Sequence, residues 1–246
     1  MGRATEVFLP ARGMGHWAVC LSVIMTKSPR ARALLLAVLL SATAGTLPGQ
    51  GPLQHWKAAT ALPAPQAFAA GVGVQGKGWV IGGESGAAAL PTVRILDPAS
   101  NAWTAGPSLP KPRTRAAAAV VGSRLFVVGG QISGSPSAST LELIQGKWKN
   151  ASSLGTARSS HAMVADASGL YVLGGLTGST PTAVKSCERF DPVLGTWSPL
   201  PDMPGPRFGH SAHLAGGKLY VFGGFSTSET QPLRSTWVYD VATKVW

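Results

Sequence analysis

The chain has 246 residues, of which 45% are hydrophobic and 13% are charged, so it carries enough apolar content for one large core. Its formal net charge is +11, but five of the 21 basic residues and one of the ten acidic residues precede Gly45. The other 16 basic and nine acidic residues are scattered singly, which argues against nucleic-acid binding. The 31 Gly and 19 Pro favour many turns over long helices.

A secretory signal peptide is predicted at residues 25–44. Lys27, Arg30 and Arg32 precede the apolar run 33–40, and the small residues Ala42-Thr43-Ala44 follow it. We therefore expect cleavage near Ala44 and a mature chain that is secreted, periplasmic or on the cell surface. The apolar run is shorter than the roughly 20 residues of a membrane-spanning helix, so no stable membrane anchor is expected, although a signal anchor remains an alternative.

Residues 1–24 would place this signal unusually far from the N-terminus. A signal of ordinary length would begin at Met25, so we interpret residues 1–24 as a mis-called extension. Of the two cysteines, Cys20 precedes the cleavage site, and the mature chain keeps Cys187 alone. Cys187 falls in a predicted strand, where we expect it to pack as a small buried residue.

Three markers recur along residues 45–246 with one drifting period of 45 to 49 residues. The glycine pairs are Gly82-Gly83, Gly129-Gly130, Gly174-Gly175 and Gly223-Gly224. The tryptophans are Trp56, Trp103, Trp148, Trp197 and Trp246. The third series is Gln66, Arg113, Arg158 and Arg207. A repeat near 50 residues indicates a propeller array.

Each unit is predicted to form four short strands. Alternating apolar residues with β-branched and aromatic side chains support the strands, and Gly, Pro, Ser and Asn fill the gaps. The glycine pair is expected where a core strand ends, the backbone turns sharply and neighbouring units approach closely. The Trp ring is expected to fill the wedge between units. The four units cover about 67–104, 114–148, 159–197 and 208–246.

The order of motifs in each unit resembles the kelch repeat: a Gly pair, an Asp-Pro turn, Trp, Leu-Pro and then Arg-x-x-His. Arg158 with His161 and Arg207 with His210 match this pattern, whereas the first unit has Gln66 and the second has Ala116 in place of His. The resemblance implies an all-β fold, a kelch-type β-propeller of four-stranded blades around a central axis.

The blade count leaves one strand without a blade. Trp56 marks a strand near 53–57, which in kelch rings commonly joins the last blade, yet the last unit already has Trp246. Since kelch rings usually hold six or seven blades, we expect an incomplete ring in which at least one further blade is missing.

Candidate ligand-binding residues lie in the segments that lead into the blades and in the Ser-, Thr- and Gly-rich loops after the glycine pairs. The arginine series is expected to surround the central opening on this face, where guanidinium groups could bind carboxylates. The resemblance leaves open whether these arginines bind partners or tie a loop to the neighbouring blade. The candidate residues are Gln66, Arg113, Arg115, Arg158 and Arg207.

No metal or cofactor site is expected. His161 and His210 are expected to pack and hydrogen-bond within their blades. A copper oxidase resembling galactose oxidase would need a paired Tyr and Cys, but Cys187 and the tyrosines occupy ordinary repeat positions. Glu84 and Glu229 are the acids on the loop face, and neither has an evident partner for acid–base catalysis.

The sequence therefore predicts an exported, non-catalytic kelch-repeat module that binds a protein or carbohydrate ligand through loops on one face. The alternative is a carbohydrate-active enzyme resembling a periplasmic sialic acid mutarotase. A pair of carboxylates in the central opening would favour the enzyme, and an apolar or aromatic rim would favour protein binding.

Overall fold

A computed structural model describes residues 58–229 and 231–246. The expected extension, signal peptide and Trp56 strand fall within residues 1–57 and lie outside the described residues. In the part of the chain that the structure describes, no helix is long and apolar enough to cross a membrane.

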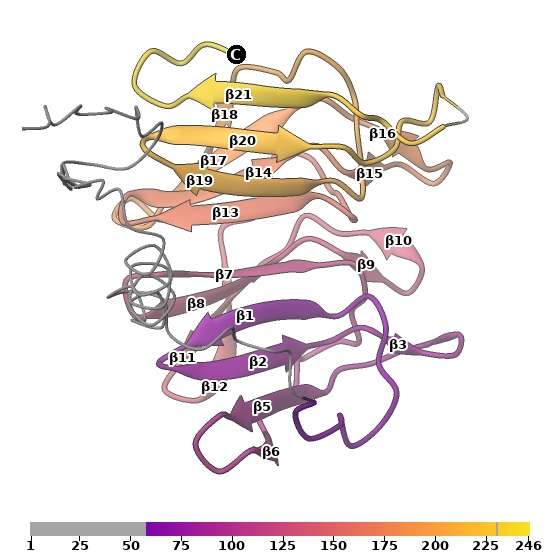
Figure 1. Cartoon of the computed structure of the whole chain (residues 1–246), viewed down its shortest axis with the longest axis vertical. Coiled ribbons are helices and arrows are strands. Elements are labelled where there is room, and N and C mark those ends of the chain that lie inside the picture. The colour runs from indigo at the N-terminus through magenta and orange to yellow at the C-terminus, as the bar shows by residue number, and fades with distance from the viewer. Residues whose placement is uncertain (1–57, 230) are drawn as a thin grey trace, which may run out of the picture. The chain divides into compact units, whose positions relative to one another are not determined.

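Four antiparallel sheets, one from each repeat, form the blades (Figure 1). Blade 1 holds β1 (Ala70–Val74), β2 (Lys77–Ile81), β5 (Val93–Asp97) and β6 (Ala102–Ala105). Blade 2 holds β7 (Ala117–Val121), β8 (Arg124–Val128), β11 (Thr140–Ile144) and β12 (Lys147–Ala151). Blade 3 holds β13 (Ala162–Asp166), β14 (Gly169–Leu173), β17 (Cys187–Asp191) and β18 (Thr196–Leu200). Blade 4 holds β19 (Ser211–Ala215), β20 (Lys218–Phe222) and β21 (Thr236–Asp240). The all-β propeller arrangement of four blades is confirmed.

Blade 4 differs from the expected pattern at its last strand. After β21 the chain makes an isolated bridge between Asp240 and Val245 in place of a fourth strand. Trp246 nevertheless donates from its indole nitrogen to the carbonyl of Pro201 at 2.9 Å. Trp148 and Trp197 donate in the same way to the carbonyls of Pro107 and Ser152. Each Trp thus ties the outer part of its blade to the segment that leads into that blade.

A two-stranded hairpin follows the glycine pair in each of the first three blades. The hairpins are β3 (Glu84–Ser85) with β4 (Ala88–Ala89), β9 (Gln131–Ile132) with β10 (Ser135–Pro136), and β15 (Leu176–Thr177) with β16 (Thr182–Ala183). They all lie at the same ends of the blades, on the right in Figure 1. We call this side the loop face.

The first strand of each blade is innermost. The strand order within the sheets runs from the first strand to the fourth, and β1, β7, β13 and β19 lie side by side. Between them is a cavity of about 360 Å³. Its lining includes Val72, Met163 and Leu214, and His213 is the titratable side chain among the described residues that line it.

The hydrophobic core lies between the blades. Strand alternation sends one set of side chains to each face of a sheet, so Phe126 of blade 2 packs with Leu170, Val172 and Phe190 of blade 3. Burying one such side chain stabilises the fold by about 1.5–3 kcal/mol. Cys187 is buried in the next cluster, as expected, and burial raises the pKa of its thiol to about 12.

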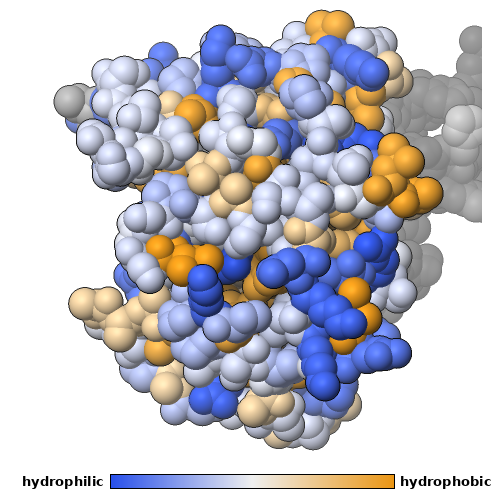
Figure 2. Space-filling model, turned by 180° about the vertical axis from the view of Figure 1, so that it is seen from behind, coloured by the Kyte–Doolittle hydropathy of each residue, from blue (hydrophilic) through white to orange (hydrophobic). Residues whose placement is uncertain are grey.

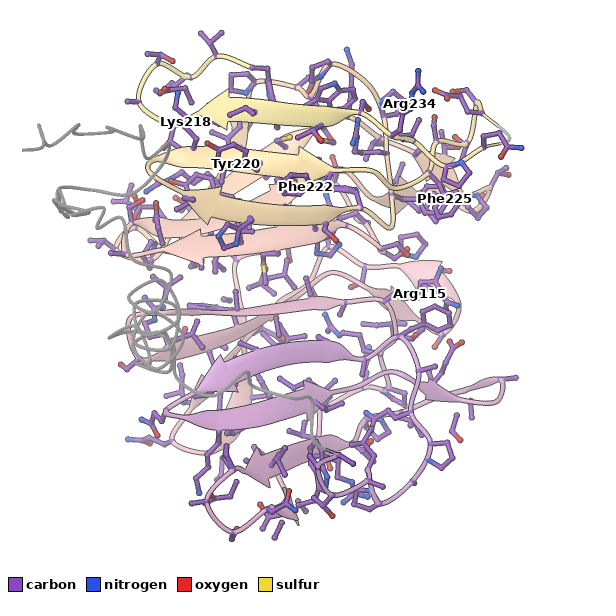
Figure 3. All side chains as sticks on the ribbon, in the orientation of Figure 1. Arg115, Lys218, Tyr220, Phe222, Phe225 and Arg234 are labelled. Atoms are coloured by element: carbon purple, nitrogen blue, oxygen red, sulfur yellow. The ribbon has the colours of Figure 1, made fainter. Side chains whose placement is uncertain are left out.

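One face of blade 4 lacks this cover among the described residues. Tyr220 and Phe222 of β20 occupy the positions of Tyr171 and Leu173 in β14, which pack against blade 4. Phe222 is 43% exposed, whereas Leu173 is fully buried. Figure 3 shows Lys218, Tyr220 and Phe222 along this strand. The face has the composition of an interface between blades.

The glycine pairs lie where neighbouring blades meet. The amide of Gly130 donates to the carbonyl of Arg158 in the next blade at 2.8 Å, and Gly175 donates to Arg207 in the same way. Both glycines have positive φ, and a Cβ on Gly130 would lie 2.7 Å from the carbonyl oxygen of Thr114. The predicted sharp turn and close approach at these glycines are confirmed.

Candidate binding site on the loop face

The arginine series holds the blades together from inside. Arg113, Arg158 and Arg207 are at most 3% exposed. Each donates from Nη1 to the carbonyl of the first glycine of its own repeat, at 2.7 to 2.8 Å. Their own carbonyls accept from the second glycine of the preceding repeat. Each arginine therefore connects two consecutive blades.

This placement differs from the expected ring of guanidinium groups around the opening. The physical reason is the row of carbonyl oxygens at the strand ends, which needs donors once it is buried. Gln66 follows the same pattern, because its side-chain amide donates to the carbonyl of Gly82. Of the two roles that the sequence left open, the geometry supports the structural one at these four positions.

A second series, two residues after each marker, is half-buried or exposed. It consists of Phe68, Arg115, Ser160 and Gly209, all with φ between 51° and 59°. Their backbones form a ladder: Arg115 donates to Phe68, Ser160 to Arg115 and Gly209 to Ser160, each at 2.9 Å. The ladder links the four consecutive blades through their backbones.

Arg115 is the charged centre of this series. Its guanidinium pairs with Glu84 at 3.0 Å, bonds to the side chain of Gln131 at 3.3 Å, and stacks 4.1 Å from the centre of the Phe68 ring. Its side chain remains 28% exposed. The predicted candidate Arg115 is thus the one of the five whose charge reaches the surface, although Glu84 neutralises part of it.

Apolar side chains continue the series towards blade 4. Phe225 follows the last glycine pair, is 46% exposed, and packs against Phe208 with 5.8 Å between ring centres. Leu176 occupies the equivalent position in blade 3. Arg115 and Phe225 lie along the same side of the blades in Figure 3. We call the whole set the inner rim: Phe68, Glu84, Arg115, Gln131, Ser160, Leu176, Phe208 and Phe225.

The charged residues of the inner rim, Glu84 and Arg115, thus belong to blades 1 and 2, whereas Leu176, Phe208 and Phe225 make it more apolar at blades 3 and 4. The back of the molecule looks different, because hydrophobic residues there form small patches among more polar ones (Figure 2). Glu229, the other predicted acid, is exposed in the loop after Phe225. Glu84 is already occupied by Arg115 and by the hydroxyl of Thr114.

The two histidines are buried rather than bound to a partner. Both ring nitrogens of His161 and of His210 lack a hydrogen-bond partner among the described residues, so the expected hydrogen bonds within the blades are not found. Burial lowers the pKa of His161 to about 3, and the nearby charges of Arg158 and His210 add to this effect. In the described part of the chain, no cluster of three His, Cys, Asp or Glu side chains could hold a metal ion.

Stability should therefore depend on the charge state of His161. In the unfolded chain this histidine takes up a proton near pH 6.5, whereas in the folded chain it does so only near pH 3. The contribution of neutral His161 to the free energy of unfolding is fully present above pH 6.5 and is lost as the pH is lowered towards 3. At pH 4.5 the part of this loss that is due to His161 should be about 2–3 kcal/mol. Urea unfolding at pH 7 and pH 4.5 should show a smaller loss in His161→Leu, and an equal loss would contradict this assignment.

Comparisons with known proteins agree with this architecture. Residues 117–246 match the family model of the KLHDC2/KLHL20/DRC7 Kelch-repeats domain. The human Kelch-like protein 33 is 45% identical over 42 residues, which are 17% of this chain and 8% of that protein. The solved structure of YjhT superposes with a TM-score of 0.62 and 17% identity over 69% of this chain and 63% of that chain. This chain thus spans less than two thirds of either relative, and the likeness to YjhT is one of fold.

Proposed function

Because the chain belongs to the kelch-repeat family, we propose that it is a binding module that recognises a segment of a protein partner through the inner rim. The kelch propeller fold supports a binding role in general terms. One observation carries the proposal: the partly exposed ion pair of Arg115 and Glu84 and the exposed Phe225 lie on the same side of the molecule. Aromatic and Arg anchors of this kind dominate protein interfaces.

The rim composition favours a peptide with an apolar anchor. Phe225 and Phe208 offer an aromatic surface but few polar atoms, which suits an apolar side chain better than a sugar hydroxyl. At the other end, Arg115 and Gln131 can bond a carboxylate or a peptide carbonyl. A partner segment that crosses from blade 4 to blade 2 could use both.

The alternative of a carbohydrate-active enzyme receives less support. General acid–base catalysis on a sugar needs two groups whose pKa values are set apart. Glu84 is held by Arg115, and His213 is the titratable side chain among the described residues that line the cavity between the innermost strands. The mutarotase-like function stays a hypothesis that a glycan-binding result would favour.

Two substitutions at the inner rim test the proposal. A peptide selected from a phage-displayed random library against the immobilised chain should bind about 10- to 100-fold more weakly to Arg115→Gln and to Phe225→Ser. Fluorescence polarisation with the labelled peptide measures the affinity. Val193→Ser removes an exposed apolar side chain from the turn between β17 and β18, outside the inner rim, so it should change nothing.

Two results would contradict the proposal. One is that every selected peptide binds both rim variants as tightly as the original chain. The other is a soluble glycan whose binding, in place of that of peptides, depends on Phe225 and Arg115, which would move the ligand to the carbohydrate class.

We also propose that the protein is exported, on the basis of residues 25–44. N-terminal sequencing of the protein recovered outside the cytoplasm should begin at Gly45. A product that still carries residues 25–44 would contradict this, and a cleavage-blocked precursor that begins at Met1 would refute Met25 as the start.

A further inference from the structure

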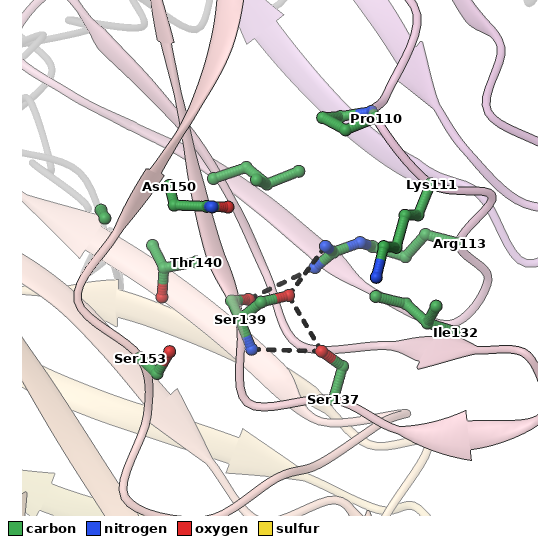
Figure 4. Close-up of a pocket in the computed structure, with 11 residues that line it drawn as sticks. Pro110, Lys111, Arg113, Ile132, Ser137, Ser139, Thr140, Asn150 and Ser153 are labelled. Carbon is green, nitrogen blue, oxygen red and sulfur yellow. Dashed lines mark hydrogen bonds between the residues drawn. The ribbon is translucent and has the colours of Figure 1, made fainter.

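A second cavity lies on the outer side of blade 2. It has a volume of about 450 Å³ and shares no lining residue with the inner rim. The segment that leads into blade 2 contributes Lys111 and Arg113, and the segment between β10 and β11 contributes Ser137 and Ser139 (Figure 4). The charged residues among its described lining are both cations. We call it the blade 2 pocket.

Arg113 in this pocket lacks the partner that its counterparts have. In blades 2, 3 and 4 the second residue of the third long strand lies beside the arginine. In blade 3 this residue is Glu188, whose carboxylate lies 2.7 Å from Nη2 of Arg158. In blade 4 it is Trp237, whose ring lies 3.5 Å below the guanidinium of Arg207. In blade 2 it is Leu141, which can neither neutralise nor stack on Arg113 in the same manner.

The guanidinium of Arg113 is therefore a buried cation without a counterion in the described part of the chain. It is 3% exposed, its Nε has no hydrogen-bond partner there, and burial lowers its pKa to about 10. A buried charge without a partner is strongly unfavourable. An anion in the adjoining pocket would reduce this cost.

Two serine hydroxyls connect Arg113 to the pocket through hydrogen bonds. Nη2 of Arg113 donates to Oγ of Ser139 at 2.8 Å, and this oxygen lies 2.9 Å from Oγ of Ser137. The amide of Ser139 also donates to Oγ of Ser137 at 3.1 Å. The two hydroxyls have two hydrogens, and only one can lie between them. The other is free to donate to a ligand, and the adjacent guanidinium strengthens it as a donor.

From this geometry we infer that the blade 2 pocket binds a small hydroxylated carboxylic acid. The carboxylate accepts from the free serine hydroxyl and from the ammonium of Lys111, which is exposed at the pocket. Asn150 and Ser153 on the opposite wall bond the hydroxyl groups of the ligand. The inference is independent of the partner proposed for the inner rim.

Gluconate and sorbitol form a matched pair of probes, because they differ in a carboxylate against a CH₂OH group. The ¹⁵N-labelled chain is titrated with sodium gluconate or with sorbitol at constant pH and ionic strength. The NMR chemical shifts of the Ser137 and Ser139 amides are followed. Gluconate should give a saturable shift with a Kd at least about tenfold below that of sorbitol, as one charge-assisted hydrogen bond implies.

Variants at exposed lysines locate the site. Lys111→Met should weaken gluconate binding by about tenfold or more, whereas Lys149→Met on β12, outside the pocket, should leave it unchanged. Ser137→Ala should weaken it as well. Equal binding of sorbitol, or equal effects of the two lysine variants, would overturn the proposal. Tighter binding of inorganic phosphate than of gluconate at the same amides would overturn the carboxylate assignment.

Discussion

Replacing Arg158 by methionine is expected to lower the free energy of unfolding by about 3–5 kcal/mol. The change removes donors to the carbonyls of Gly174 and Ser186, at 2.8 and 2.9 Å, and leaves the carboxylate of Glu188 buried without its cation. Methionine fills much of the volume, so the loss reports the unpaired polar groups rather than a cavity. Urea unfolding at pH 7, followed by tryptophan fluorescence, measures it.

Arg207→Met provides the matched control for this prediction. Arg207 makes the same bonds to Gly223 and Ser235, but it stacks on Trp237 and has no carboxylate at the position of Glu188. The loss of stability in Arg207→Met should therefore be smaller, because no buried carboxylate is left without its cation. Equal losses in the two variants would show that Glu188 contributes nothing to the stability of blade 3.

Gly175→Ala should strongly destabilise blade 3. Gly175 has φ near 106°, and the new Cβ would lie 2.7 Å from the carbonyl oxygen of Ser159 and 2.9 Å from Cβ of His161. The backbone of the neighbouring segment must shift, which also strains the bond from Gly175 to Arg207. We expect a loss of about 2–4 kcal/mol, since overpacking alone costs about 1–3 kcal/mol and the left-handed conformation adds about 1 kcal/mol.

Gly195→Ala separates these two causes. Gly195 lies in the turn between β17 and β18 with φ near 68°, and nothing lies within 4 Å of its added Cβ. Only the cost of the left-handed conformation, about 1 kcal/mol, should appear there. Thermal unfolding of both variants measures the difference. A loss in Gly195→Ala as large as in Gly175→Ala would refute close approach as the reason for the second glycine of each pair.

The repeat markers made most of the fold predictable from the sequence. The glycine pairs and tryptophans recur at one period, so they gave the blades, their order and the points where neighbouring blades approach. The fourth strand expected near Trp246 was wrong, although β6, β12 and β18 form at the equivalent edge of the other blades. The structure there has a single bridge at Val245.

The candidate site was harder to predict, because recurrence does not show where a side chain points. Arg158 and Arg207 recur at the spacing expected of a ligand-binding ring. Their guanidinium groups are nevertheless buried, because they donate to carbonyl oxygens at the strand ends. The more exposed series, with Phe68 and Ser160 among its members, shares a left-handed backbone and no side-chain chemistry. Its signal in the sequence is position alone, two residues after each marker.

The bonds of Arg158 also bear on how the chain folds during synthesis. They join residues 16, 28 and 30 positions apart, and the bonds of Trp148 and Trp197 span 41 and 45 positions. A blade can therefore close once about one repeat has left the ribosome, before the next repeat exists. Each folded blade then offers a surface on which the next blade can pack, so folding should advance blade by blade from the N-terminus. A translational pause one repeat after a glycine pair would give each blade time to fold.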